Sequence, residues 1–209
     1  MKLKKKVKIT LFIILWIIVA VAGIFVYKKY FATKSKEVKE VKVVNQVEKY
    51  GYTLKENKPA KYKEMFEELK KILNKENVDE EEYVKKITEM FIYDFYSLND
   101  KVAKTDIGGT EFVYNEILEN FLKNAQDTYY KYIESNIYNN RKQSLPVVAN
   151  ISIDNVEKKP FAYGNKTDEE AYVVEASWTY TDDQFSSYQN KATLVFIHDD
   201  VKLSLVELQ

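Results

Sequence analysis

The stretch KATLVFIHDDVKLSLVEL, residues 191–208, decides the fold. Apolar and polar side chains alternate on both sides of Asp199-Asp200, which is typical of two β-strands joined by a two-residue turn. Residues that flank such a turn pair with each other and share one face of the sheet. This turn predicts an apolar face that packs on helices, made of the pairs His198–Val201, Phe196–Leu203 and Leu194–Leu205.

Two more alternating runs precede this hairpin, at residues 147–156 and 171–180. The connections between the runs are short, which favours antiparallel neighbours and a four-stranded meander. In the run 171–180 one side is clearly the more apolar, and we expect it to face the core. That side carries Tyr172, Val174, Ala176, Trp178 and Tyr180.

Upstream of Leu145 the apolar period is 3.6 residues and predicts three helices. The first begins after Pro59, which suits a first-turn position. The second opens at Asp79 with Glu82 three residues later, a capping-box pattern. The third runs from about Thr110 to Tyr138. Helices followed by a meander predict an α+β fold, with about three helices packed on a four-stranded antiparallel sheet.

The N-terminus predicts a membrane anchor. Nineteen uncharged residues, Ile9 to Tyr27, span roughly 28 Å as a helix, close to the thickness of the bilayer hydrocarbon. Lysines are denser before this run than after it, which favours a cytoplasmic N-terminus and an extracytoplasmic C-terminal part. The alternative is a cleaved signal peptide, for which Ala20-Val21-Ala22 has suitable small residues. The apolar run continues past that site, so we expect an uncleaved anchor.

The predicted anchor divides the chain into three segments. Residues 1–29 form a basic cytoplasmic tip and the transmembrane helix, residues 30–58 a charged stalk or linker, and residues 59–209 an extracytoplasmic α+β domain. Residues 1–36 hold nine lysines and no acidic residue, so residues 37–209 carry 23 basic and 32 acidic side chains, a net charge of −9. Because nucleic acid is bound mainly through cationic side chains, an acidic domain is a poor partner for it.

The composition excludes several other classes of chemistry. There is no cysteine, so disulfides, thiolate metal sites and thiol catalysis are excluded. Asp79-Glu-Glu-Glu82 lacks the alternating oxygens and central glycine of a calcium loop, and acids at a helix start already complement its dipole. Gly108-Gly109-Thr110 lacks the spacing and lysine of a phosphate loop, so we interpret it as a linker. We expect no metal and no cofactor.

The C-terminal half resembles a known superfamily. The segments Ala171-Tyr-Val-Val-Glu-Ala-Ser-Trp178, Ala192-Thr-Leu-Val-Phe-Ile197 and Lys202-Leu-Ser-Leu-Val206 are similar to the end of nuclear transport factor 2-like domains. The resemblance implies a cone of helices against a curved sheet. Membrane-anchored bacterial versions include single-pass assembly subunits of type IV secretion and conjugation machines. Enzymatic members place an Asp/His pair in the cone, and no such pair can be assigned from this sequence.

The segment from Phe91 through Asp106-Ile-Gly-Gly109 is also similar to small single-pass anchored proteins of A+T-rich Gram-positive bacteria. This second resemblance agrees with the predicted anchor but implies no particular function, because the role of those proteins is unassigned.

Aromatic side chains are the main binding candidates. Phe161 and Tyr163 lie in the predicted connection 158–170, and Phe185 and Tyr188 in the connection 181–190. Aromatics on loops favour an interaction surface. His198 is the only histidine, and turn chemistry accounts for the two aspartates beside it. The meander places the connection 158–170 at the same end as His198, so Tyr163 and His198 are expected to be neighbours.

Three functions fit these observations. The first is a non-enzymatic, membrane-tethered interaction or assembly module of the cell envelope, which docks another envelope protein or a second copy of itself. The second is a ligand-binding cone with a pocket between the third helix and the sheet, lined by tyrosines, Trp178 and His198. The third is a subunit of a secretion-like channel. No catalytic constellation is evident, so we expect a protein that binds rather than reacts.

Overall fold

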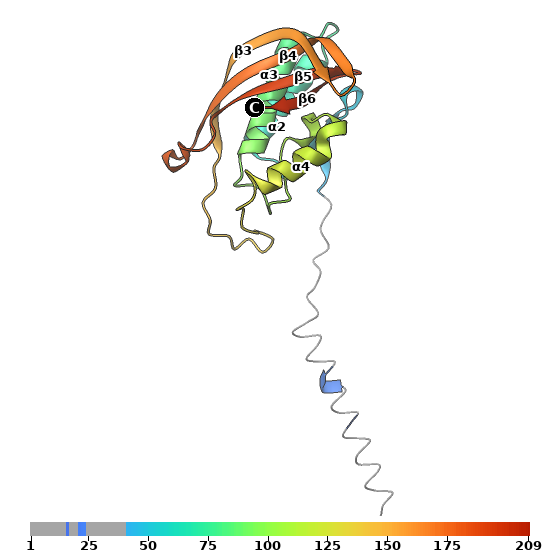
Figure 1. Ribbon diagram of the computed structural model, residues 1–209. Coiled ribbons are helices and arrows are strands. Elements are labelled where there is room, and N and C mark those ends of the chain that lie inside the picture. The colour runs from blue at the N-terminus through green and yellow to red at the C-terminus, as the bar shows by residue number, and fades with distance from the viewer. Residues whose placement is uncertain (1–15, 17–20, 24–40) are drawn as a thin grey trace, which may run out of the picture. The chain divides into compact units, whose positions relative to one another are not determined.

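The computed structural model describes residues 41–209, together with residue 16 and residues 21–23 (Figure 1). Residues Val41–Gln209 form one compact unit, and residues 1–40 are assigned to a separate unit. The predicted anchor, residues 9–27, lies almost entirely outside the described residues. No helix within the described residues has the length and the apolar composition to cross a membrane.

The first two predicted helices are confirmed. Helix α2 spans Ala60–Leu73, directly after Pro59, and α3 spans Glu80–Tyr96. Asp79 is the N-cap of α3, and its carboxylate accepts hydrogen bonds from the backbone N–H groups of Glu81 and Glu82. The acidic run at residues 79–82 therefore serves the start of a helix. Nearly every side chain of α3 from Tyr83 on is buried, because α2 packs on one side and the sheet on the other.

The third predicted helix is wrong over most of its length. Only Leu118–Asp127 is α-helical, as α4, and two 3₁₀ turns, η2 (Thr110–Phe112) and η3 (Asn115–Ile117), precede it. Helix formation is interrupted because the backbone N–H of Tyr114 donates to the carbonyl of Leu205 in the sheet. At the other end, Tyr130 is fully buried and its hydroxyl donates to the carbonyl of Phe95. Tertiary contacts thus override the local helical pattern.

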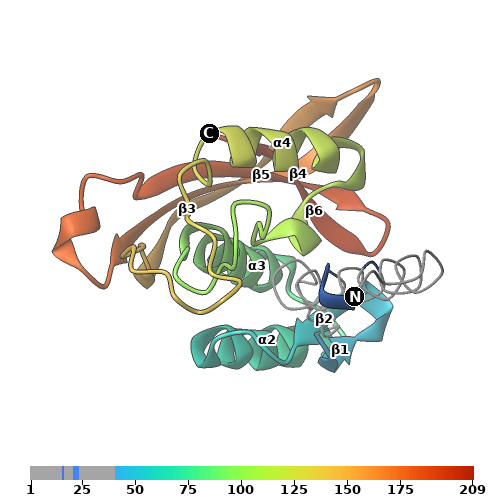
Figure 2. The same cartoon turned by 90° about the horizontal axis from the view of Figure 1, so that it is seen from below.

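The predicted four-stranded antiparallel sheet is confirmed. Its strands are β3 (Val148–Tyr163), β4 (Lys166–Tyr180), β5 (Lys191–Asp199) and β6 (Lys202–Leu208), in the order β3-β4-β5-β6. The sheet arches over α3 in Figure 1, and α2 lies beyond α3 in Figure 2. The side of β4 predicted to be apolar faces the core, with Val174 fully buried and Trp178 3% exposed.

Two details of strand pairing differ from the prediction. The connection expected at residues 158–170 is strand almost throughout, because β3 and β4 turn tightly at Gly164, whose φ is 56°. The last turn is Asp200-Val201, with Asp200 at φ 58°, so His198 pairs with Leu203 and Phe196 with Leu205. These two predicted pairs are shifted by two residues, whereas Leu194 pairs with Leu208, three residues beyond the predicted Leu205, because the register shifts between Val195 and Phe196. A shift of two preserves the face, which explains why the predicted apolar side is still the buried one.

A small hairpin of β1 (Val43–Val47) and β2 (Tyr52–Lys55) lies within the segment that was predicted to be a linker. Its side chains Val47, Tyr52 and Leu54 are buried in the main core. The compact unit therefore begins near Val41 rather than at residue 59.

A buried ion cluster ties α3 to the segment that leads into α4. The carboxylate of Asp94 lies 2.6 Å from Nζ of Lys58 and 3.0 Å from Nζ of Lys101, and it accepts a 2.8 Å bond from the N–H of Gly109. The N–H of Gly108 donates to the Tyr130 hydroxyl. Both glycine amides thus have partners inside the protein, which supports the linker interpretation of this segment.

Candidate functional site

Phe161 and Tyr163 do not form a free loop. Both lie in β3 and are partly buried against a small cluster of Tyr114, Ala171 and Ile197. The rings of Tyr163 and Tyr114 meet edge-to-face, with centroids 5.7 Å apart. These aromatics therefore stabilise the long β3–β4 hairpin rather than offering an open surface.

Of the other predicted loop aromatics, one is buried and one is open. Phe185 lies in the 3₁₀ turn η4 (Asp183–Phe185) and is 6% exposed. Its ring packs edge-to-face on Tyr188 at 5.3 Å, and Tyr188 is 44% exposed. Tyr188 also approaches Tyr129 at 6.5 Å between ring centroids, close to a hollow between α4 and β6.

His198 has acidic partners that no local pattern revealed. Its Nδ1 lies 2.9 Å from Oδ2 of Asp168, and its backbone N–H donates to the same oxygen at 2.7 Å. Its Nε2 lies 3.5 Å from Oε2 of Glu80, the first residue of α3. The expected neighbour Tyr163 is not among these partners. Asp168 was assigned to a connection, so no local signal pointed to this Asp/His pair.

Hydrogen bonds around His198 stabilise the ionised form of both carboxyl groups. Burial alone would raise the pKa of Asp168, but the N–H groups of His198 and Glu170 and the His198 ring lower it overall. The pKa of Glu80 is also lowered, against the effect of burial, by the Tyr172 hydroxyl and by His198. The cluster joins β4, β5 and the start of α3. A cavity of about 200 Å³ adjoins it, lined in part by Tyr50, Tyr83 and Lys202.

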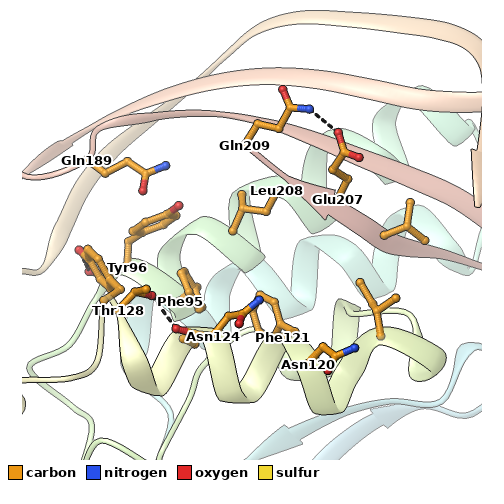
Figure 3. A pocket seen from close by; sticks show the side chains of 14 residues that line it. Phe95, Tyr96, Asn120, Phe121, Asn124, Thr128, Gln189, Glu207, Leu208 and Gln209 are labelled. Carbon is orange, nitrogen blue, oxygen red and sulfur yellow. Dashed lines mark hydrogen bonds between the residues drawn. The ribbon is translucent and has the colours of Figure 1, made fainter.

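The larger hollow lies between α4 and the end of β6, and we call it the α4–β6 groove (Figure 3). Its volume is about 490 Å³, within the range of small-molecule sites. Residues from the end of α3 form its floor, the segment from η3 through Tyr129 one side, and β6 with Gln189 the other. The lining residues are Phe95, Tyr96, Ile117, Asn120, Phe121, Asn124, Ala125, Thr128, Tyr129, Gln189, Val206, Glu207, Leu208 and Gln209.

Uncharged polar side chains border the groove on both sides. Asn120, Asn124 and Thr128 follow one another at intervals of four along α4 and its C-cap, so they line a single edge of that helix. Gln189 and Gln209 stand across from them in Figure 3. Among the described residues that line the groove, only Glu207 has a charged side chain. Carboxamides both donate and accept hydrogen bonds, so these borders suit a neutral polar ligand.

Aromatic rings make the floor. Phe95 lies 5.3 Å from Phe121 between ring centroids, and Tyr96 lies 5.1 Å from Tyr129. Burial raises the pKa of Tyr96 and of Tyr129, so both remain neutral at physiological pH. Trp178 packs on Tyr96, with ring centroids 4.3 Å apart, but does not line the groove itself.

The predicted pocket between the third helix and the sheet therefore has a counterpart, with a different lining. Tyr96 and Tyr129 line the groove, whereas Trp178 contacts it only through Tyr96 and His198 lines the smaller cavity. The helical spacing of Asn120 and Asn124 was visible in the sequence. Their partners across the groove come from a loop and from β6, which only the fold brings near.

Within residues 41–209 and the few described residues before them, no group of three or more His, Cys, Asp or Glu side chains is arranged to hold a metal ion. Comparisons with protein-family models, with curated proteins and with solved structures find no match to this chain.

Proposed function

We propose that this protein is a membrane-tethered binding protein of the cell envelope, which holds its ligand in the α4–β6 groove. The observation that carries the proposal is the groove itself, with about 490 Å³ of space, an aromatic floor and borders of carboxamides. A concave, mostly apolar site with a few polar groups is the usual form of a ligand site. The ligand-binding cone is thus preferred to a surface module that docks through aromatic loops.

One observation supports the alternative function, a module that docks another protein through its surface. Tyr188 is 44% exposed beside the groove, whereas Phe161, Tyr163 and Phe185 are packed against their neighbours. A protein partner or a second copy would therefore use Tyr188 together with the groove. Two further ideas stay predictions. One is the resemblance to the cone of nuclear transport factor 2-like domains, and the other is the role of a secretion-channel subunit. A gene far from any transfer cluster would count against the latter.

The tether rests on the run from Ile9 to Tyr27 and on the lysines around it. Deleting residues 2–29 should move the protein from the membrane fraction to the soluble fraction. A protease added to intact cells, after the wall is removed, should digest the C-terminal domain. A full-length chain found in the soluble fraction, or a domain that only lysis exposes, would contradict this part of the proposal.

Binding in the groove can be followed by methyl NMR of the full chain in detergent micelles. Ile117, Val206 and Leu208 line the groove, and their methyl signals should shift with neutral compounds from a fragment library. The core methyls of Leu69 and Ile87 should not shift, because both side chains are fully buried away from the groove.

Filling the groove provides the control. Asn124→Trp should abolish these shifts, whereas Lys123→Trp, on the adjacent exposed position of α4, should retain them. A library that leaves the groove methyls unshifted in a folded protein would refute the proposal.

A further inference from the structure

Strand β6 forms one edge of the sheet. An edge strand presents unpaired backbone N–H and C=O groups and is a template for pairing with another chain. The opposite edge, β3, carries three irregularities in its pairing with β4, against one in the pairing of β5 with β6, and bulges of this kind discourage strand addition. Strand β6 is therefore the edge better suited to accept another strand.

The backbone groups of β6 that point away from β5 can be followed along the strand. The N–H of Leu203 donates to the Tyr83 hydroxyl, and the carbonyl of Leu205 accepts from the N–H of Tyr114. Gln209 exchanges both of its backbone bonds with Thr193 of β5. The pairing of β5 with β6 shifts register between Val195 and Phe196, so the alternation of Leu203 and Leu205 does not continue past Val206. Because pairing alternates along an antiparallel strand, counting back from Gln209 makes the N–H and C=O of Leu208 point outward, toward the groove.

The chain already adds a short strand-like segment to this edge. Val113 forms a parallel bridge with Leu205, and the chain then turns away at Asn115 into η3 and α4. The edge beyond it, from Val206 to Gln209, is left facing the groove. The groove is thus a gap in the pairing of β6, bordered by α4.

We propose that an extended peptide segment of a partner protein enters the α4–β6 groove and pairs with β6 as an added strand. This inference rests on the proposed function and names the ligand class for the same site. At about 3.3 Å per residue, the stretch from Val206 to Gln209 is roughly 13 Å long and admits about four peptide residues, which would pair with the outward N–H and C=O of Leu208. The carboxamides of Asn120 and Asn124 face the other side of such a strand.

Charge narrows the class of peptide. Glu207 is the one charged side chain among the described lining residues, and residues 37–209 carry a net charge of −9. An acidic peptide would meet repulsion with no lysine or arginine among these lining residues to offset it. The aromatic floor favours apolar side chains on alternate residues. The peptide is therefore apolar and polar in alternation, and neutral or basic.

The experiment uses the full chain in micelles and the groove methyls of Ile117, Val206 and Leu208. The probe is a pool of acetylated, amidated tetrapeptides built from alanine, valine, threonine, serine and lysine. The pool should shift the groove methyls, and a matched pool with glutamate in place of lysine should bind more weakly. Asn124→Trp should abolish the shifts, and Lys123→Trp should leave them unchanged.

The decisive measurement compares the affinities of two N-methylated versions of the tightest-binding peptide in the pool. One version is methylated at the odd-numbered residues and the other at the even-numbered residues, and we call these the two phases. Methylation of the amides that face β6 should weaken binding by about tenfold or more, since each lost hydrogen bond contributes on the order of a factor of ten. Methylation of the other phase should weaken binding less, because those amides face only the side-chain carboxamides of Asn120 and Asn124.

The outcomes separate the two proposals. Equal effects of methylation in the two phases would overturn the strand addition and retain the groove as a binding site. The same conclusion would follow if the peptide pool does not bind while neutral fragments, or an oligosaccharide such as chitotetraose, shift the groove methyls. Failure of peptides, fragments and oligosaccharide alike would overturn both.

Discussion

Asp94 offers the most direct test of how the groove is positioned. Its side chain is buried between Lys58, Lys101 and the N–H of Gly109, and the next two residues, Phe95 and Tyr96, form the groove floor. Replacing Asp94 by alanine leaves the ammonium of Lys101, which is 3% exposed, with Asp100 as its remaining acidic partner. Removing one partner of a buried ion pair costs about 3–5 kcal/mol. We expect a loss of that size in the free energy of unfolding.

The pH dependence gives an independent magnitude. Burial alone would raise the pKa of Asp94, but Lys101 and Lys58 lower it from 3.8 to about 2. Lowering a pKa by this much corresponds to about 2 kcal/mol of stability. Because the folded pKa lies below the unfolded one, this stability is complete above about pH 4 and is lost as the pH falls toward 2. Asp94→Asn should remove this part of the acid sensitivity.

The assay is urea denaturation of residues 41–209, followed by tyrosine and tryptophan fluorescence at several pH values. Asp127→Ala, at the exposed end of α4, is the control. Like most surface substitutions, it should change the free energy of unfolding by less than about 0.5 kcal/mol. A cost below about 1 kcal/mol for Asp94→Ala would show that water or rearrangement replaces the lost partner. The cluster would then not hold α3 to the segment before α4.

Four further substitutions test the fold around the site. Gly108→Ala would place a Cβ within overlap distance of the backbone carbonyl of Asp94. Overpacking of this kind should destabilise the domain by about 1–3 kcal/mol, and a neutral effect in thermal melts would contradict the close approach of these two backbones. Asp168→Asn should make the free energy of unfolding decrease less as the pH falls below about 4, since the pKa of Asp168 is lowered in the folded state. The same decrease in the variant and the unchanged protein, in the same urea series, would contradict the Asp168–His198 pair. Phe185→Ala should cost about 3–5 kcal/mol in urea unfolding, whereas Tyr188→Ala should cost less than about 1 kcal/mol; comparable losses would contradict their assigned burial.

Local patterns predicted the fold where local forces dominate. Helices α2 and α3 begin where Pro59 and Asp79 indicated, since a helix start is decided by its own first turn. The core face of β5 and β6 was predicted despite a register error of two residues in the pairs nearest the turn, because side-chain direction in a strand alternates with period two.

Local patterns failed where distant groups compete for the same backbone. The segment 110–138 has a helical period, yet Tyr114 pairs with Leu205 and Tyr130 is drawn into the core. Phe161 and Tyr163 were expected on a loop, but a tight turn at Gly164 lets both strands continue. In the segment 110–138 a tertiary hydrogen bond and a buried ring outweigh a preference that is small for each residue, whereas at Gly164 the turn itself was missed.

The sequence by itself determined the α+β class, the helices α2 and α3, the four-stranded meander and the faces that meet in the core, because each depends on the periodicity of neighbouring residues. The membrane anchor stays a prediction. Only the tertiary structure decided the site. The pair of His198 with Asp168 joins residues 30 positions apart, and the groove joins α4 to Gln189 and the end of β6. Such neighbours depend on where strands turn and where a helix stops. Those choices are made by contacts between segments, which no single segment of the sequence contains.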